Sequence, residues 1–269
     1  MTADGAASPV GLVTGAARGI GAATAGRLLD DGWRVVAVDS CAGDRGDEVL
    51  PYALATREDL DAVVSGHGDA AVAAVVDVRD RDALQQVVQD TLGRWGRLDA
   101  AVAAAGVILG GTPLWETPEP ELDLLWEVDL RGVWNTAAVT VPAMLAGPDP
   151  SRCRFVAVAS AAGTHGLFHL AGYNVVKHAV VGLVKGLAAD LVGTGMTAVA
   201  VSPGSTRTEM LTATAGLYGL DGPGDLADAQ LIRRLIEPGE LAAAVAFCCS
   251  PEGAVLNGSV LHADGGFGR

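Results

Sequence analysis

Residues 14–21 read TGAARGIG, and this stretch decides the fold. It follows the apolar run VGLVT at 10–14 and leads into AATAGRLLDDG at 22–32, which has a helical pattern. Glycines in such a turn allow close approach of a ligand to the backbone, and the helix that follows offers unpaired N–H groups to an anion. A glycine-rich string alone is a weak signal, because many turns use glycine. A strand before it and a helix after it make it a predicted pyrophosphate site.

The rest of the chain repeats this alternation of short apolar runs and helical stretches. The runs are continuously apolar, as in parallel strands that are covered by helices on both faces. Besides VGLVT, six runs are expected to be strands: WRVVAV (33–38), AVAAVV (71–76), LDAAVAA (98–104), RFVAVAS (154–160), MTAVAVS (196–202) and GSVLHA (258–263). The sequence therefore predicts an α/β fold in which residues 1–269 form a single domain around a seven-stranded parallel sheet, with helices on both faces.

Two connections are longer than this alternation needs. The first, at about 40–68, is predicted to be an insertion with its own helix, because Thr56 and Asp59 have the spacing of a capping pair before LDAVV. The second, at about 205–228, is rich in Gly, Thr and Ala and is predicted to form a substrate lid. For the first segment, a surface insertion without ligand contact is the alternative.

Composition argues against several classes of function. The chain carries 32 acidic and 18 basic residues, a formal charge of −14, and no Lys/Arg cluster, so nucleic acid is not expected as a partner. Apolar runs stay well short of the roughly eighteen residues that a membrane span needs, so no membrane association is expected. MTADGAAS at 1–8 lacks the basic and apolar regions of a signal peptide, and we expect the protein in the cytoplasm.

Cysteine and histidine spacing indicates neither a disulfide framework nor a metal site. His165 and His169 are four residues apart, but no third ligand stands at a recognisable spacing, so no metal is expected. The sequence has no CxxC pair, and reduced thiols are expected at Cys41, Cys153, Cys248 and Cys249.

An acidic residue ends the second predicted strand. Asp39 follows about twenty residues after the glycine turn, where a carboxylate can accept both ribose hydroxyls of an adenosine and repel a 2′-phosphate. This position favours NAD over NADP, although a solvated aspartate at a strand end is the alternative. Arg18 can contact a phosphate from inside the turn. Asp77 and Val78, after the third strand, are placed for the adenine.

The stretch AGYNVVKHAV at 171–180 holds Tyr173 and Lys177 one helical turn apart on the same face. Ser160 ends a strand thirteen residues before the tyrosine, and ligands bind at such strand ends. A buried ammonium beside a phenol favours the phenolate, so we expect the pKa of Tyr173 to lie below the ordinary value of about 10. Proton transfer by Tyr173 near neutral pH then becomes feasible, with Ser160 holding the substrate oxygen. A YxxxK pair alone, however, occurs by chance in many proteins and is structural in most of them.

In order and spacing these motifs resemble the short-chain dehydrogenases/reductases across nearly the whole chain. The matching motifs are TGAARGIG, Asp39, AAAG (103–106), Ser160, YNVVK (173–177), PGSTRT (203–208) and HADGGF (262–267). The resemblance implies a Rossmann-type doubly wound domain, NAD as cofactor, and hydride transfer at nicotinamide C4 with Ser160, Tyr173 and Lys177 as the catalytic residues. The implied cofactor-binding residues are Gly15, Arg18, Gly19, Ile20, Gly21, Asp39, Asp77, Val78, Ala105, Gly106, Tyr173, Lys177, Pro203, Gly204, Thr206 and Thr208.

Two positions depart from the family pattern. AAAG stands where the family usually has NNAG, so no asparagine side chain steadies that strand end. VDLRG at 128–132 places Asp129 where the family usually has an asparagine that helps to hold a water beside the lysine. An aspartate is similar in size but brings a charge to the surroundings of the lysine, so we assign Asp129 only as a support.

The segment after Asp39 narrows the resemblance. VDSCAGD (38–44), PYALATREDLDAVV (51–64) and PGSTRTEML (203–211) are similar to the carveol-dehydrogenase-like subgroup that is associated with the redox cofactor mycofactocin. The resemblance implies that the insertion covers the adenosine end and that NAD stays bound between turnovers. It also implies that the hydride passes to mycofactocin as an external electron carrier.

The substrate and the assembly are predicted only in outline. A largely apolar pocket is expected for a secondary or allylic alcohol, or for the corresponding ketone, with His165, Phe168, His169 and Leu211 in its wall. Family members commonly form tetramers, so the resemblance implies a homotetramer, with a dimer as the alternative. The apolar circumference of 175–191 is consistent with burial of this helix in an interface.

Two other functions stay open. One is an NADPH-dependent 3-oxoacyl reductase, which Asp39 disfavours because of its charge. The other is a non-catalytic nucleotide-binding protein, which the complete set of Ser160, Tyr173 and Lys177 disfavours.

Overall fold

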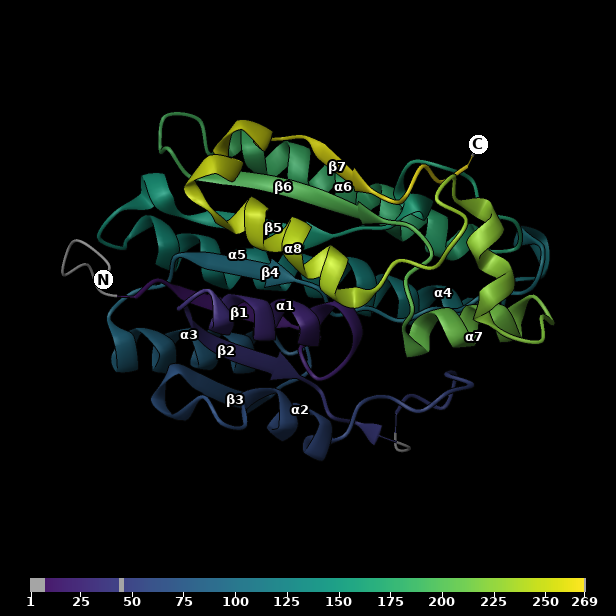
Figure 1. Ribbon diagram of the computed structural model, residues 1–269, viewed down its shortest axis with the longest axis horizontal. Coiled ribbons are helices and arrows are strands. Elements are labelled where there is room, and N and C mark those ends of the chain that lie inside the picture. Colours follow the sequence, from purple (N-terminus) through teal and green to yellow (C-terminus); the bar gives the residue numbers. More distant parts are fainter. Residues whose placement is uncertain (1–7, 44–45, 269) are drawn as a thin grey trace.

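The structure, a computed structural model, describes residues 8–43 and 46–268. These residues form a seven-stranded sheet in the order β3-β2-β1-β4-β5-β6-β7, in which every neighbouring pair is parallel. The prediction of a doubly wound α/β fold with a seven-stranded parallel sheet is confirmed (Figure 1). Residues 1–7 lie outside the described residues, and the expectation that residues 1–8 are not a signal peptide falls almost entirely on them. Residues 44 and 45 of the insertion also lie outside the described residues.

Each strand coincides with one of the predicted apolar runs, with boundaries that differ by at most two residues. The strands are β1 (Val10–Thr14), β2 (Arg34–Asp39), β3 (Ala71–Val75), β4 (Ala100–Ala103), β5 (Arg154–Val158), β6 (Thr197–Pro203) and β7 (Val260–Ala263). In the register of the sheet, Thr14 lies beside Val38 on one side and Ala103 on the other. The carboxyl ends of β2, β1 and β4 therefore meet at one edge of the sheet.

Helices connect the strands and cover both faces of the sheet. They are α1 (Gly19–Asp30), α2 (Arg57–Val64), α3 (Arg81–Trp95), α4 (Glu119–Leu125), α5 (Gly132–Leu145), α6 (Ala171–Asp190), α7 (Glu209–Leu217) and α8 (Pro238–Cys249), with a π-helical segment, Trp126–Arg131, between α4 and α5. The predicted capping pair starts α2: Thr56 Oγ1 accepts a hydrogen bond from the backbone N–H of Asp59, and the Asp59 carboxylate accepts one from the backbone N–H of Thr56.

Alternate residues of the strands point into two separate cores. On one face, Leu12 and Phe155 pack with residues of α3, α5 and α6. On the other face, Val13 and Val156 pack with residues of α1, α2 and α8. Figure 1 shows this second layer in front of the sheet and α5 and α6 behind it. Burial on both faces explains why the strands read as continuously apolar.

The strand order reverses between β1 and β4, since β1 is followed by β2 and β3 on one side and by β4 to β7 on the other. In open α/β sheets, ligands bind outside the carboxyl ends of the strands at this point. In Figure 1 the arrowheads of the strands point toward α4 and α7, and the segment before α2 extends along the same edge. The fold thus brings the glycine turn, the insertion and the predicted lid to one place.

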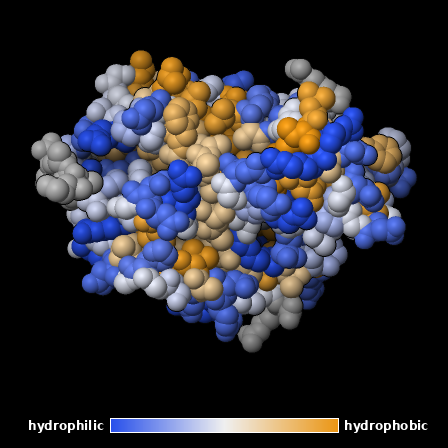
Figure 2. Space-filling view, in the orientation of Figure 1, coloured by the Kyte–Doolittle hydropathy of each residue, from blue (hydrophilic) through white to orange (hydrophobic). Residues whose placement is uncertain are grey.

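One face of the molecule is largely hydrophilic (Figure 2), and the cysteines of the described residues form no disulfide. Figure 2 shows hydrophilic residues over much of one face and a paler, weakly hydrophobic strip across its middle, over α1 and α8. Within 8–43 and 46–268, none of the helices has the length and apolarity that crossing a membrane requires. No disulfide joins the four cysteines, all of which lie within the described residues.

Candidate active site

A cavity of about 640 Å³ lies at the carboxyl edge of the sheet. It is lined by the glycine turn, the ends of β2, β4, β5 and β6, part of the insertion, and α7. All sixteen cofactor-binding residues expected from the sequence border this one cavity, together with Ser160, Phe168 and Leu211. Residues far apart in the chain are therefore brought together as the motifs predict.

The glycine turn has the shape of a phosphate cradle. Gly15 adopts a left-handed backbone with φ of 64°, and a Cβ on it would lie 2.6 Å from the Cα of Ala105. A Cβ on Gly21 would overlap the carbonyl oxygen of Gly15. The turn thus leaves space that only glycine permits, directly before the N-terminus of α1, where unpaired backbone N–H groups favour an anion.

Asp39 is anchored at the end of β2. Its Oδ2 accepts a hydrogen bond from the backbone N–H of Ala17 at 3.1 Å, and its Oδ1 accepts one from the N–H of Cys41, also at 3.1 Å. Each carboxylate oxygen can accept a further hydrogen bond. The residue borders the cavity, so these free positions suit the hydroxyls of a ribose.

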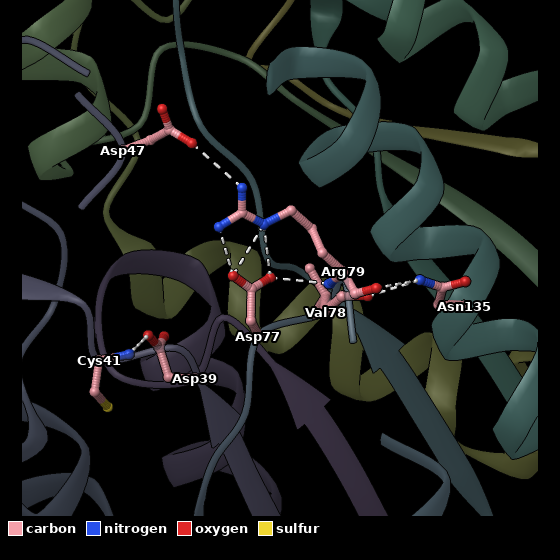
Figure 3. A network of polar contacts seen from close by, with 7 residues as sticks. All are labelled: Asp39, Cys41, Asp47, Asp77, Val78, Arg79 and Asn135. Atoms are coloured by element: carbon pink, nitrogen blue, oxygen red, sulfur yellow. Dashed lines mark hydrogen bonds and ion pairs between the residues drawn. The ribbon is translucent and has the colours of Figure 1, made fainter. Parts of the chain in front are cut away.

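A polar network joins the end of β3 to the insertion (Figure 3). The Arg79 guanidinium lies 2.7 Å from Asp77 Oδ2 and 3.3 Å from Asp47 Oδ2. Asn135 Nδ2, on α5, donates hydrogen bonds to the carbonyl oxygens of Val78 and Arg79 and fixes the backbone of this loop. Arg79 therefore links the predicted adenine site to a residue of the insertion.

The catalytic residues predicted from the sequence converge at the inner end of the cavity. Tyr173 and Lys177 both stand on the buried face of α6, and Lys177 Nζ lies 5.4 Å from the centroid of the Tyr173 ring. Ser160 follows β5, and its side chain lies within hydrogen-bonding reach of the Tyr173 hydroxyl. A substrate oxygen between the serine and tyrosine hydroxyls would have a donor on each side.

Asp129 is part of this cluster. Its side chain is completely buried, and its Oδ1 lies 2.9 Å from Lys177 Nζ, so the two residues form a buried ion pair. Its Oδ2 accepts a hydrogen bond from the backbone N–H of Val107 at 3.1 Å. The π-helical segment carries Asp129 to this position, and such segments occur frequently at functional sites.

Burial and the neighbouring charges shift the pKa values of Asp129 and Lys177 in opposite directions. Burial raises the pKa of Asp129, while Lys177 lowers it. Burial alone would lower the pKa of Lys177, but Asp129 and Tyr173 raise it above its ordinary value. The lysine is therefore held as an ammonium by the carboxylate beside it.

The expected lowering of the Tyr173 pKa is wrong. Burial raises the pKa of Tyr173 above 10; Lys177 and the Ser160 hydrogen bond lower it, whereas Asp129 raises it. Lys177 acts in the predicted direction, but burial outweighs it and Asp129 acts in the same sense as burial. The main reason is the complete burial of the phenol, to which the carboxylate at position 129, in place of the usual asparagine, adds.

The predicted substrate residues divide into two groups. Phe168 and Leu211 border the cavity, whereas His165 and His169 are not among its lining residues. The His165 ring lies edge-on to Phe267, and His169, with a left-handed φ of 55°, stacks on the Phe168 ring. Both histidines thus pack against phenylalanine rings that themselves border the cavity.

The comparisons with known proteins agree with this geometry. The family model described as enoyl-(acyl carrier protein) reductase matches residues 15–268. The (−)-trans-carveol dehydrogenase of Rhodococcus erythropolis is 34% identical over 80% of this chain and 76% of its own. This chain belongs to the short-chain dehydrogenase/reductase family. An uncharacterized NAD-dependent oxidoreductase of Mycobacterium tuberculosis (strain CDC 1551 / Oshkosh) is 39% identical over 75% of this chain and 73% of its own.

Solved structures of short-chain dehydrogenases/reductases share the whole fold. The crystal structure of carveol dehydrogenase from Mycobacterium avium in complex with NAD superposes with a TM-score of 0.89 at 30% identity, covering 97% of each chain. The predicted resemblance to this family and to its carveol-dehydrogenase-like members is confirmed.

Sequence reasoning missed several residues at the site of this short-chain dehydrogenase/reductase. Tyr52 and Asp47 of the insertion border the cavity, as do Arg79 and, from the segment after α7, Tyr218. One signal was available: the chain has only three tyrosines, and all three border this cavity. The contact of Arg79 with Asp47 left no signal, because it joins two surface residues 32 positions apart.

Proposed function

We propose that this protein is an NAD-dependent alcohol dehydrogenase or carbonyl reductase. The observation that carries the proposal is the convergence of Ser160, Tyr173 and Lys177 in the cavity that also holds the glycine turn and Asp39. A non-catalytic nucleotide-binding protein would not need a buried lysine beside a buried tyrosine. Burying these groups costs free energy, and natural proteins keep such groups mainly where they serve function.

In the direction of alcohol oxidation, Ser160 and Tyr173 hold the substrate oxygen. The phenolate form of Tyr173, stabilised by the Lys177 ammonium, takes the hydroxyl proton and becomes a neutral phenol. When bound, the nicotinamide supplies the hydride acceptor at C4. In the reverse direction, Tyr173 returns its proton to the carbonyl oxygen while Ser160 donates a hydrogen bond to it.

NAD is the cofactor that the site favours. The free acceptor positions of Asp39 suit the 2′- and 3′-hydroxyls, and its charge repels a 2′-phosphate. An NAD-dependent oxidoreductase and a carveol dehydrogenase solved with NAD are among the relatives. Gly15, Arg18, Gly19, Ile20 and Gly21 would hold the pyrophosphate. For the other parts of NAD we propose Asp77, Val78, Ala105, Gly106, Pro203, Gly204, Thr206 and Thr208, with Tyr173 and Lys177 at the nicotinamide ribose.

The insertion at about 40–68 holds NAD in place between turnovers. Arg18 Nη2, in the glycine turn, donates a hydrogen bond to the carbonyl oxygen of Ala53 at 2.8 Å, and Arg79 pairs with Asp47. The insertion is thus tied to both sides of the nucleotide site. These ties must break before NAD leaves, which slows its dissociation. An enzyme with a retained nucleotide needs an external carrier to reoxidise it, and mycofactocin is our candidate.

The proposal also covers the domain organisation, the location and the assembly of the protein. Residues 1–269 form one domain, with a lid at about 205–228 that includes α7 and covers an apolar alcohol or ketone. The protein resides in the cytoplasm, where its four free cysteines stay reduced. It assembles as a homotetramer through α5 and α6; exposed apolar side chains at Trp126, Trp134 and Val175 support burial of this face against another copy.

Mass spectrometry of protein purified without added nucleotide tests the proposal. We expect about one NAD(H) per chain, no NADP(H), and reduction of the bound NAD when a secondary alcohol is added. A redox dye then restores the oxidised form without release of nucleotide. An alcohol that leaves the bound NAD unchanged would contradict the assigned reaction, and nucleotide that exchanges freely would contradict retention.

A further inference from the structure

Tyr52 connects the insertion to the segment that follows β4, beside the catalytic cluster. Its Oη accepts a hydrogen bond from the backbone N–H of Ile108 at 2.8 Å. Ile108 lies 56 positions further along the chain, just beyond the AAAG segment that ends β4. The bond therefore fixes the tip of the insertion against the strand end that borders the catalytic cluster.

The ring of Tyr52 packs into a third apolar cluster, separate from the two cores of the sheet. The buried part of this cluster includes Ile108, Leu170 and the catalytic Tyr173, and the partly buried part includes Met210 and Tyr218 from the lid region. Insertion, lid and catalytic helix thus contribute to one apolar surface. Tyr52 also borders the cavity itself, together with Tyr173.

The chemistry of Tyr52 differs from that of Tyr173. Burial raises the pKa of the Tyr52 phenol, the Ile108 hydrogen bond lowers it, and Asp129 and Tyr173 raise it further. Its neighbouring cation is Arg18, which acts weakly, whereas Tyr173 has the Lys177 ammonium beside its ring. Tyr52 therefore stays a neutral phenol and offers a fixed ring surface, not a second base.

From this placement we infer that Tyr52 is a specificity-determining residue, whose ring forms a wall of the substrate pocket beside Tyr173 and limits the size of the alcohol or ketone. The inference rests on the proposed function and deepens it. One segment then has two tasks, since residues around Asp47 and Ala53 hold the nucleotide while Tyr52 shapes the space for the substrate. A bulky ring in the cavity wall favours slim apolar alcohols over branched ones.

The test compares cyclohexanol with 4-tert-butylcyclohexanol in three variants. Tyr52→Ala removes the wall and is expected to raise the ratio of kcat/KM for the bulky over the small alcohol by about tenfold, the scale of discrimination by one hydrophobic wall. Tyr52→Phe keeps the ring and is expected to hold the ratio within about threefold of wild type. Asp47→Asn loosens the nucleotide cover away from the reaction centre, so NAD release is faster while the ratio stays at the wild-type value.

Binding of cyclohexanone and 4-tert-butylcyclohexanone to the NAD-loaded proteins, measured by calorimetry, gives the same ratio without turnover. Circular dichroism confirms that each variant is folded. If Tyr52→Ala accelerates NAD release but leaves both ratios unchanged, Tyr52 belongs only to the nucleotide cover and the inference is overturned. A wild-type protein that binds both ketones but oxidises neither alcohol would instead contradict the proposed function and leave the binding ratio as the test of Tyr52.

Discussion

Lys177 Nζ lies 2.9 Å from Asp129 Oδ1, and the two side chains are only 4% and 0% exposed. Together with the neutral phenol of Tyr173, they form a buried cluster without net charge. Removal of a proton from this cluster leaves a buried negative charge, which burial disfavours. An asparagine at position 129 would leave the cluster with one positive charge, and the loss of a proton would then neutralise it.

This relationship predicts the effect of Asp129→Asn on the pH dependence of catalysis. The pKa of Tyr173 is raised, in part by Asp129, so removal of that charge moves the ionisation needed for alcohol oxidation to lower pH. The shift has this direction whether the proton leaves Tyr173 or Lys177, because the two groups titrate as a pair. The measurement is the pH profile of kcat/KM for alcohol oxidation.

Glu127→Gln is the matched control for Asp129→Asn. It removes one carboxylate from the same π-helical segment, but Glu127 is partly exposed and pairs with Arg131. We expect its pH profile to coincide with that of wild type. A profile of Asp129→Asn that also coincides with wild type, or that moves to higher pH, would show that Asp129 does not set the acidity of the pair.

The sequence predicts the strands, the glycine turn and the catalytic residues because each leaves a local pattern. Continuous apolarity marks strands buried on both faces, and Thr56 with Asp59 marks a helix start. The position of Tyr52 depends on a contact with Ile108 that no local pattern encodes. The direction of the Tyr173 pKa depends first on the burial of its phenol and then on the charges of Lys177 and Asp129, and only the packed structure shows these surroundings.

Asp39→Asn tests the basis of the NAD preference. The amide oxygen can still accept one of the backbone hydrogen bonds from Ala17 and Cys41, but the charge that repels a 2′-phosphate is gone. We expect discrimination against NADP to fall by at least about tenfold, which corresponds to about 1.4 kcal/mol. Competition between NAD and NADP, followed by mass spectrometry of the bound nucleotide, gives this ratio. An unchanged ratio would remove Asp39 as its determinant.

Arg79→Ala tests the link between the insertion and the adenine site. The ion pair with Asp47 is partly exposed, at 40% and 31%, so its contribution is modest, about 0.5–1 kcal/mol. We therefore expect NAD to dissociate about two- to fivefold faster, as measured by exchange with isotopically labelled NAD. Arg94→Ala, which removes an exposed pair with Asp69 away from the cavity, is the control. Equal exchange rates in both variants would contradict a role of Arg79 in retention.

Gly21→Ala tests the tight turn, and Gly26→Ala on the same helix is its control. A Cβ on Gly21 would overlap the Gly15 carbonyl oxygen, whereas a Cβ on Gly26 meets no atom within 4 Å. We expect Gly21→Ala to lower the free energy of unfolding by about 1–3 kcal/mol and to lose NAD. Gly26→Ala is expected to raise it by about 0.5–1 kcal/mol, because alanine favours a helix. Thermal unfolding, checked against denaturant titration, distinguishes the two; similar losses in both would contradict the turn geometry.

Hydride transfer in a single turnover of Tyr173→Phe tests the role of Tyr173 most directly. The variant keeps the ring and removes only the hydroxyl, so the protein should still be purified with about one NAD per chain. Addition of a secondary alcohol to this loaded protein should reduce the bound NAD at least about 100-fold more slowly than in wild type, the usual contribution of an acid/base group. Reduction at the wild-type rate, with NAD fully bound, would contradict Tyr173 as the group that takes the proton.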